Sequence, residues 1–258
     1  MELPQPQDRP AWFFDFDGTL AEIAPTPDAA RAPRGVIDVI TRLLDLDVAI
    51  AVVSGRPLAE LDALLAPLRL PAAGVHGGER RDARGRVHRI ATPPIGPALD
   101  LALALCRELD PALRLEQKPG AIALHYRQAP KLEARCIALM ERVAAEVAGM
   151  ELLRGKMVVE LKPAAVDKGR AVRAFLAEPP FSGRRAWYFG DDVTDESALI
   201  AVQTEGGIGV KLGEGPSAAV RRLSGPAEML RWLERAAAAF ERHRGSAPAA
   251  AATRRVVS

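Results

Sequence analysis

The sequence predicts an α/β fold in which a doubly wound parallel sheet forms the core and a smaller α+β domain is inserted into it. Apolar runs at residues 12–16 and 48–53 end in Asp-Gly and Ser-Gly, as buried strands of parallel sheets end in functional loops. Apolar residues recur at helical spacing over residues 33–46, which lie between these runs. Strand, helix and strand form a crossover unit, and the pattern returns after residue 167.

Composition excludes several classes of protein. With 48% hydrophobic and 26% charged residues, the chain of 258 residues has the make-up of a globular protein that buries a sizeable core. Its net charge of +2 comes from basic and acidic residues spread along the chain, without a basic block that would grip nucleic acid. We therefore expect no nucleic-acid partner. We also expect a small-molecule substrate and a monomer.

Cysteine usage and hydropathy indicate the compartment. Cys106 and Cys136 lack the spacing of metal or redox sites, so we interpret them as buried, reduced thiols. The first ten residues lack a basic region followed by an apolar one, and no stretch reaches the ~18 apolar residues of a membrane span. We expect a cytoplasmic protein without a membrane partner.

The first part of the core is predicted to cover residues 1–94. After the helix at 33–46 and the strand at 48–53, Pro57 suits the start of a second helix, and a strand follows at 72–75. Residues 77–90 are polar, with a predicted hairpin turn at 83–85. A pair of prolines then marks the boundary to the insert.

The insert, residues 95–166, is predicted to have the order α-β-β-α-β-β. Alanine content favours a helix over 98–109, and a second helix follows Pro130. Strands are predicted in two pairs, at 113–117 with 121–126 and at 151–154 with 157–161, each pair joined by a turn that contains glycine. The insert therefore forms a small sheet with helices on one face.

The second part of the core is predicted over residues 167–244. It contains a helix to about residue 176, a strand at 186–189, a helix after Thr194 and a strand at 207–210. Further helices are predicted from Pro216 and Pro226. Residues 245–258 are small and rich in alanine, and we expect a disordered tail there.

Two carboxylates follow the first predicted strand, in the run DFDGT at residues 15–19. In an open parallel sheet, ligands bind beyond the carboxyl ends of the strands. An acidic turn that caps a helix would explain one aspartate and the glycine. It explains Asp15 together with Asp17 less well, because like charges this close repel unless a cation or a shared proton compensates.

A second acidic run, GDDVTDE at residues 190–196, ends another predicted strand. Thr194, Asp195 and Glu196 suit the first turn of a helix, which leaves Asp191 and Asp192 to be explained. Two acidic strand ends in one sheet form an oxygen-ligand site for a hard cation. Mg²⁺ with waters and a substrate phosphate is the expected occupant.

Two further segments favour phosphate binding. Ser54, Gly55 and Arg56 end a third strand just before a helix N-terminus, where backbone N–H groups are exposed. Lys168 lies at the start of a helix, where a lysine is unhelpful to the helix dipole and is usually a solvated side chain. Its place there slightly favours a role that faces phosphate.

Together these residues resemble the haloacid dehalogenase superfamily of phosphohydrolases. Residues 15–19 match its first motif, Ser54 its second, Lys168 its third and residues 190–192 with Asp195 its fourth, in the right order. The resemblance implies a Rossmann-type core with an inserted cap domain. It also implies phosphate-ester hydrolysis through an aspartyl phosphate.

The resemblance also implies a role for each matching residue. Asp15 would attack phosphorus, and Asp17 would protonate the leaving oxygen and later deprotonate water. Ser54 and Lys168 would hold the phosphoryl oxygens. The metal, Mg²⁺, would be bound by Asp15, by the backbone carbonyl of Asp17 and by Asp191, with Asp195 acting through water. Further substrate contacts are assigned to Thr19, Gly55 and Arg56.

Specificity is expected from the insert, which would cover the catalytic face and exclude water. From their pattern alone, its charged strand residues could form a solvated face. Beside the catalytic motifs, however, they resemble the trehalose-6-phosphate phosphatases, a family within the superfamily. That family has a Gly-x-His-Gly stretch, a Lys before His-Tyr-Arg, and a Gly-Lys…Glu-Leu-Lys-Pro run. The positions here that match these motifs and would meet the substrate are His76, Lys118, His125, Arg127, Lys156 and Glu160.

The resemblance implies Mg²⁺-dependent hydrolysis of trehalose 6-phosphate, the last step of trehalose biosynthesis. Related phosphatases that act on sucrose 6-phosphate, mannosyl-phosphoglycerate or a monosaccharide phosphate remain alternatives, as does a phosphomutase. A sugar-phosphate sensor without turnover is a further alternative. Loss of Asp15 or Asp17 would be its expected sign, and both are present.

Overall fold

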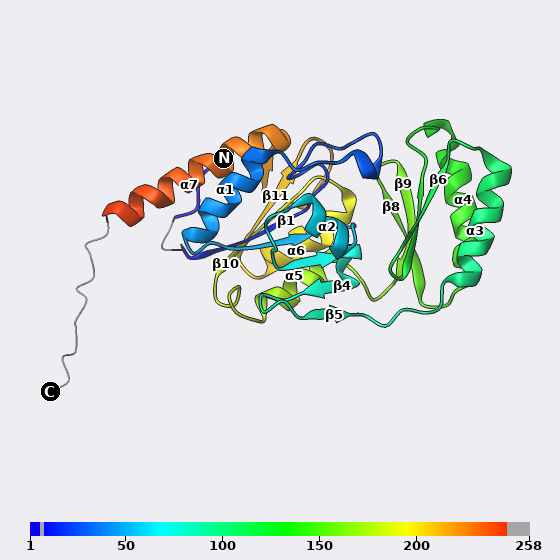
Figure 1. The fold of residues 1–258 in the computed structure, drawn as a ribbon, viewed down its shortest axis with the longest axis horizontal. Coiled ribbons are helices and arrows are strands. Elements are labelled where there is room, and N and C mark those ends of the chain that lie inside the picture. The colour runs from blue at the N-terminus through cyan, green and yellow to red at the C-terminus, as the bar shows by residue number, and fades with distance from the viewer. Residues whose placement is uncertain (6–7, 247–258) are drawn as a thin grey trace.

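The computed structural model describes residues 1–5 and 8–246, which form two sheets (Figure 1). The larger, eight-stranded sheet has the order β12-β11-β10-β1-β2-β3-β4-β5. The strands from β12 to β3 run parallel, and β4 and β5 form an antiparallel hairpin at one edge. The bounds are β1 (Pro10–Phe14), β2 (Ala49–Val53), β3 (Ala72–Gly74), β4 (Glu79–Arg81), β5 (Val87–Arg89), β10 (Arg185–Gly190), β11 (Ile208–Leu212) and β12 (Arg221–Leu223).

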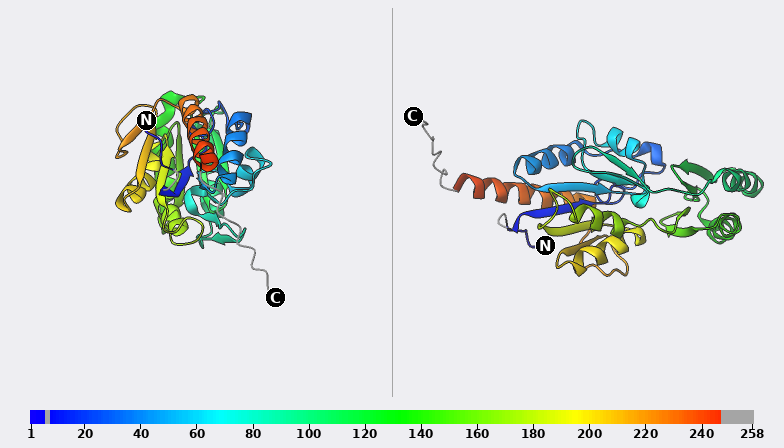
Figure 2. Two further views of the ribbon diagram at one scale, coloured as in Figure 1. Left: turned by 90° about the vertical axis from the view of Figure 1, so that its left-hand side faces the viewer. Right: turned by 90° about the horizontal axis from the view of Figure 1, so that it is seen from below.

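Helices cover both faces of this core sheet, which confirms the predicted fold class (Figure 2). The side chains of β1 alternate between the faces, so that Trp12 and Phe14 lie in one apolar cluster and Phe13 lies in the other. Helices α1 (Arg34–Asp45), α2 (Leu58–Leu64) and α7 (Pro226–Ser246) pack on the first face; α5 (Lys168–Leu176) and α6 (Glu196–Thr204) pack on the second. Because both faces are buried, the central strands are apolar throughout.

The smaller sheet is built from residues 114–163 and is antiparallel, with the order β6-β7-β9-β8; we call it the cap sheet. Ile122, Leu124, Val159 and Leu161 pack on one face against the two helices of this unit. The other face turns toward the core (Figure 1). The bounds are α3 (Gly96–Leu109), β6 (Arg114–Lys118), β7 (Ala121–His125), α4 (Glu133–Ala144), β8 (Met150–Gly155) and β9 (Val158–Pro163), all within the predicted insert.

The helix predicted from Pro216 is wrong. The chain there forms a loop and then β12, the edge strand of the core sheet. The Gln203 side chain donates to Ala218 O and accepts from Val220 N, and Glu196 accepts from Ala218 N. Side chains of α6 thus bond the backbone groups that a helix would have used internally.

The C-terminal end differs from the prediction in its first residues. Residues 245 and 246, which were assigned to a disordered tail, are the last two of α7. The rest of the predicted tail, residues 247–258, lies outside the described residues. Within the described ranges, none of the helices is both long and apolar enough to span a membrane.

Helix α7 is attached to the core sheet through an aromatic cluster. Trp232 is fully buried, with ring centroids 5.2 Å from Trp12, 5.6 Å from Trp187 and 5.1 Å from Phe189. Aromatic side chains bury large apolar areas and interlock at such distances. The cluster ties the last helix of the chain to the middle of the sheet.

We expect Trp232→Ala to lower the free energy of unfolding by about 3–5 kcal/mol, because it leaves a cavity between β1, β10 and α7. Urea unfolding followed by circular dichroism measures the change. Ile200→Ala, at a side chain that is 51% exposed on α6, is the control and should change it by less than about 0.5 kcal/mol. Equal effects of the two substitutions would contradict the role of the cluster.

Candidate active site

Three neighbouring strands of the core sheet carry the predicted catalytic residues at their carboxyl ends. Asp15 follows β1, Ser54 follows β2 and Asp191 follows β10, and these strands are adjacent in the order β10-β1-β2. The backbone N–H of Asp15 still donates to Phe189 O at 2.9 Å, which continues the pairing of β1 with β10. Parallel pairing therefore gathers these side chains at one edge of the sheet.

Lys168 reaches this edge from the first turn of α5. Asp167 caps the helix, its side chain accepting from Arg170 N at 2.8 Å. The Lys168 Nζ lies 2.9 Å from Asp15 Oδ1 and 2.7 Å from Asp195 Oδ1, and the side chain is 2% exposed. Burial lowers the pKa of Lys168, but the two carboxylates outweigh it and the pKa lies above its usual value. Lys168 is therefore a fixed positive charge beside Asp15.

Asp15, Asp191 and Asp195 form a candidate cation site, with a carboxylate oxygen of each within 4.8 Å of the others. Burial raises the pKa of Asp15 well above its usual value, and Lys168 offsets this only in part. Burial, followed by Asp195 and Asp192, raises the pKa of Asp191 to about 7. The three carboxylates exceed the charge of Lys168 by two, so a divalent cation with oxygen ligands fits this set.

Gly18 allows Asp191 to approach the loop after β1. A Cβ on Gly18 would lie 2.3 Å from the Asp191 carboxyl carbon, and the residue has a φ of +78°. Only glycine meets both conditions without strain.

Asp195 is held by hydrogen bonds within the protein. Its Oδ1 accepts from Lys168 Nζ and from Tyr188 Oη, the latter at 2.6 Å, and its Oδ2 accepts from Asp192 N at 3.0 Å. The side chain is fully buried. It positions Lys168, and it belongs to the candidate cation site with Asp15 and Asp191.

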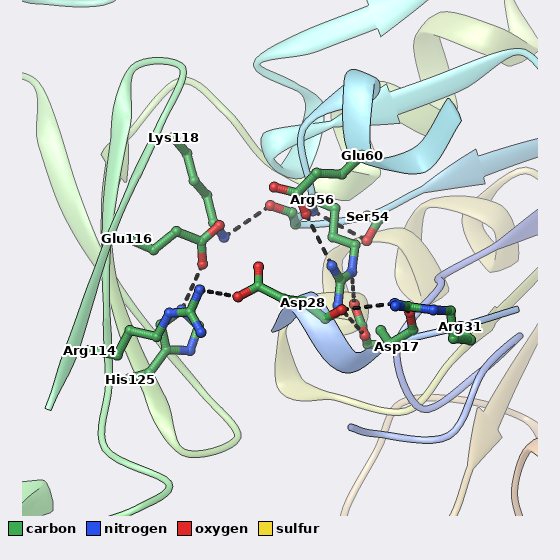
Figure 3. Close-up of polar contacts among 12 residues, drawn as sticks. Asp17, Asp28, Arg31, Ser54, Arg56, Glu60, Arg114, Glu116, Lys118 and His125 are labelled. Atoms are coloured by element: carbon green, nitrogen blue, oxygen red, sulfur yellow. Dashed lines mark hydrogen bonds and ion pairs between the residues drawn. The ribbon is translucent and has the colours of Figure 1, made fainter. Parts of the chain in front are cut away.

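The loop after β2 places a guanidinium against Asp17 (Figure 3). Arg56 donates from Nε to Asp17 Oδ2 at 2.6 Å and from a terminal nitrogen to Asp17 Oδ1 at 2.8 Å, a bidentate pair. Its other terminal nitrogen bonds Glu60 at 3.0 Å. Ser54 Oγ accepts from Arg56 N at 3.3 Å. Asp17 and the predicted phosphate loop are thus joined by a direct ion pair.

The open face of the cap sheet presents charged side chains to this loop (Figure 3). Lys118 donates from Nζ to Gly55 O at 3.0 Å and to Glu160 Oε2 at 2.8 Å. His125 Nε2 lies 2.7 Å from Glu116 Oε2. A cleft between cap and core is lined by the predicted residues Asp15, Asp17, Ser54, Gly55, Arg56, His76, Lys118, His125, Arg127, Lys156, Glu160, Lys168 and Asp191.

Two predicted residues do not line this cleft. Asp195 and Thr19 are both fully buried, and Thr19 Oγ1 has no hydrogen-bond partner within the described ranges. At the rim, Arg127 donates to Lys156 O at 3.4 Å and Lys156 N donates to Asp192 Oδ2 at 3.2 Å. The second of these bonds joins the cap to the core.

Sequence reasoning missed several residues of the cleft. Glu116 lies two positions before Lys118 on β6, so strand alternation could have identified it. Glu60, one helical turn after Arg56, has a similar local signal. Asp28 and Arg114 pair at 2.5 Å across the cleft, and nothing local predicts this contact between distant segments (Figure 3).

Comparisons with known proteins agree with the family that the sequence motifs resemble. The profile of the trehalose-phosphatase family matches residues 13–224. The trehalose-6-phosphate phosphatase of Escherichia coli (strain K12) is 43% identical over 246 residues, which cover 94% of this chain and 92% of that protein. A probable trehalose-phosphate phosphatase of Sinorhizobium fredii is 43% identical over 79% of this chain and 77% of that protein.

A solved structure has the same fold. The C-terminal domain of a Candida albicans trehalose-6-phosphate phosphatase superposes with a TM-score of 0.80 at 22% identity, covering 90% of this chain and 95% of that domain. At this identity the likeness concerns the fold alone.

The raised pKa of Asp191 predicts how cation binding depends on pH. Below pH 7 the folded, metal-free protein carries a proton on this carboxyl group, and a cation must displace it. We expect the dissociation constant of Mg²⁺, measured by calorimetry, to rise as the pH falls below about 7, by about tenfold per pH unit for the proton on Asp191, and the raised pKa of Asp15 should steepen this dependence. Asp191→Asn should bind more weakly and show a shallower dependence, because only the proton on Asp15 then remains to be displaced. An unchanged slope in that variant would assign the titration to another group.

Proposed function

The chain belongs to the trehalose-phosphatase family, and from this premise we propose that it hydrolyses trehalose 6-phosphate to trehalose and phosphate with the help of Mg²⁺. The observation that carries the proposal is the position of Asp15. It lies at the end of a buried strand, beside Lys168, in a cleft whose other wall is the polar face of the cap sheet. A phosphate monoester with a polar alcohol group suits both walls.

We assign the attack on phosphorus to Asp15. One carboxylate oxygen forms the bond to phosphorus while the bond to the sugar oxygen breaks, which gives an aspartyl phosphate. Lys168 and Ser54 hold the phosphoryl oxygens. Mg²⁺ at Asp15, Asp191 and the backbone carbonyl of Asp17 would supply the positive charge that draws nucleophile and phosphate together. Water then attacks the same phosphorus, and this releases phosphate and restores Asp15.

Asp17 is assigned the proton transfers, and Arg56 prepares it for them. Asp17 gives its proton to the departing sugar oxygen and takes one from the attacking water. In the structure its carboxylate is paired with Arg56 at 2.6 Å and 2.8 Å. A bound phosphoryl group offers Arg56 a second anionic partner, so its arrival loosens the pair and allows Asp17 to carry a proton.

The cap supports a sugar as the alcohol. Glu116, Lys118, His125 and Glu160 combine acceptors and donors on one face of the sheet, as the hydroxyl groups of a sugar require. Burial raises the pKa of Glu160, but Lys118 and His76 outweigh it and the pKa lies below its usual value. Glu160 is therefore an ionised acceptor for hydroxyl hydrogen bonds.

Phosphate release from a panel of esters tests the proposal. Trehalose 6-phosphate, sucrose 6-phosphate, glucose 6-phosphate and mannosyl-phosphoglycerate are offered with Mg²⁺, and again with EDTA. We expect a strong preference for trehalose 6-phosphate that EDTA abolishes. Preference for another ester would retain the chemistry of Asp15 but overturn the substrate, and no release from any ester would favour a sensor.

Asp15→Asn should reduce phosphate release by at least about a thousandfold, because an amide cannot form the aspartyl phosphate. The thermal midpoint should stay close to that of the unsubstituted protein or rise, since one buried negative charge is removed. Asp47→Asn, at a side chain that is 77% exposed and does not line the cleft, is the matched control and should keep most of the activity. Substantial turnover by Asp15→Asn would refute the assignment of the nucleophile.

A further inference from the structure

A buried polar chain joins the cap to the core beside the phosphate loop, residues 54–56. Glu160 Oε2, on β9 of the cap sheet, lies 2.8 Å from Lys118 Nζ of the cap and 3.4 Å from His76 Nε2 of the core. The exposed fractions of these side chains are 4% for Glu160, 9% for Lys118 and 7% for His76. Such burial makes each contact more valuable than the same contact on a surface.

Both ends of this chain return to the phosphate loop. Lys118 Nζ donates to Gly55 O at 3.0 Å, and the backbone N–H of His76 donates to Ser54 O at 2.9 Å. A Cβ on Gly55 would lie 2.8 Å from the His76 ring, so the ring packs directly on the loop. Glu160 of the cap, His76 of the core and the phosphate loop are thus joined in a ring of contacts that Lys118 completes.

Two side-chain atoms in this ring of contacts have no hydrogen-bond partner among the described residues. His76 Nδ1 and Glu160 Oε1 are buried, and neither has a hydrogen-bond partner in the part of the chain that the structure describes. Burial lowers the pKa of His76, and the neighbouring Glu160 restores it only in part, so burial favours the neutral ring. If Nε2–H donates to Glu160, Nδ1 is an acceptor, and both free atoms call for donors. Glu160 lines the cleft, so a sugar hydroxyl group is the donor that we expect for its Oε1.

We propose that His76 is a positioning residue that holds Glu160 against the phosphate loop, so that sugar binding under the cap also orders residues 54–56. This inference rests on the proposed function and adds a role for the core in sugar recognition. His76 acts through Glu160 and does not transfer the reacting proton. Its loss therefore lowers turnover of the sugar phosphate more than turnover of an ester without sugar hydroxyls.

The backbone of His76 offers a rival explanation that can be tested. Its φ of 55° and ψ of 17° are left-handed, as is the φ of 48° at Val75. Asparagine adopts this conformation more readily than most residues, whereas glutamine does not. The glutamine amide, however, reaches the position of Nε2, and the shorter asparagine amide does not. The two substitutions therefore separate the ring contact from the turn.

The experiment measures kcat and KM of the full chain with Mg²⁺ on trehalose 6-phosphate and on p-nitrophenyl phosphate. We expect His76→Ala and His76→Asn to lower the ratio of the two kcat/KM values by about tenfold, and His76→Gln to recover most of it. If asparagine restored the ratio and glutamine did not, the left-handed backbone of residue 76 would explain the effect, and the contact of the ring with Glu160 would not. Equal losses on both substrates would also overturn the proposal.

A double-substitution cycle with Glu160→Gln tests the route of the effect. If His76 acts through Glu160, adding His76→Ala to Glu160→Gln should lower the ratio by less than about twofold further. Losses that multiply would show independent roles and overturn the proposal. Unsubstituted protein measured in parallel distinguishes a failure of the proposed function from a failure of the role given to His76. If it shows no preference for trehalose 6-phosphate, the proposed function is contradicted. The cycle would then use the ester that is preferred in the panel.

Discussion

Lys168 pairs with two buried carboxylates, Asp15 and Asp195, and Asp191 adds a third negative charge beside them. Uncompensated charge of this kind is costly inside a protein, and its cost appears in the raised pKa values of Asp15 and Asp191. The apolar strands β1 and β10 hold the carboxylates in place, so the favourable free energy of packing around these strands offsets the unfavourable free energy of the buried charges. A divalent cation at these three carboxylates would relieve it.

The cap contacts the core at the same carboxyl ends of the core strands. Its own core is apolar, but its open face is polar and meets the phosphate loop through Lys118 and the acidic run through Lys156. Such contacts are directional, so they form only when the cap lies over the cleft. The position of the cap over the cleft suits the exclusion of water and the recognition of a sugar that we propose.

Most of the fold could be predicted because its signals are local. Apolar runs of strand length, helical spacing and glycine turns identified the central strands and the order of the insert. The segment after Pro216 was mispredicted as a helix, since its backbone groups bond to Gln203 and Glu196 of the neighbouring helix. Glu116 was missed although it shares a strand face with Lys118, while the pairing of Asp28 with Arg114 has no local signal at all.

By itself, the sequence determined the class of chemistry, because carboxylates that follow buried parallel strands must meet at one edge of the sheet. Only the tertiary structure decided which charged groups pair with one another. It joined Arg56 to Asp17, Asp195 to Lys168 and His76 to Glu160. The physical reason is that the alternation of residues along a strand predicts which side chains share a face, whereas the packing of the separate cap sheet over the core decides which residues that face contacts.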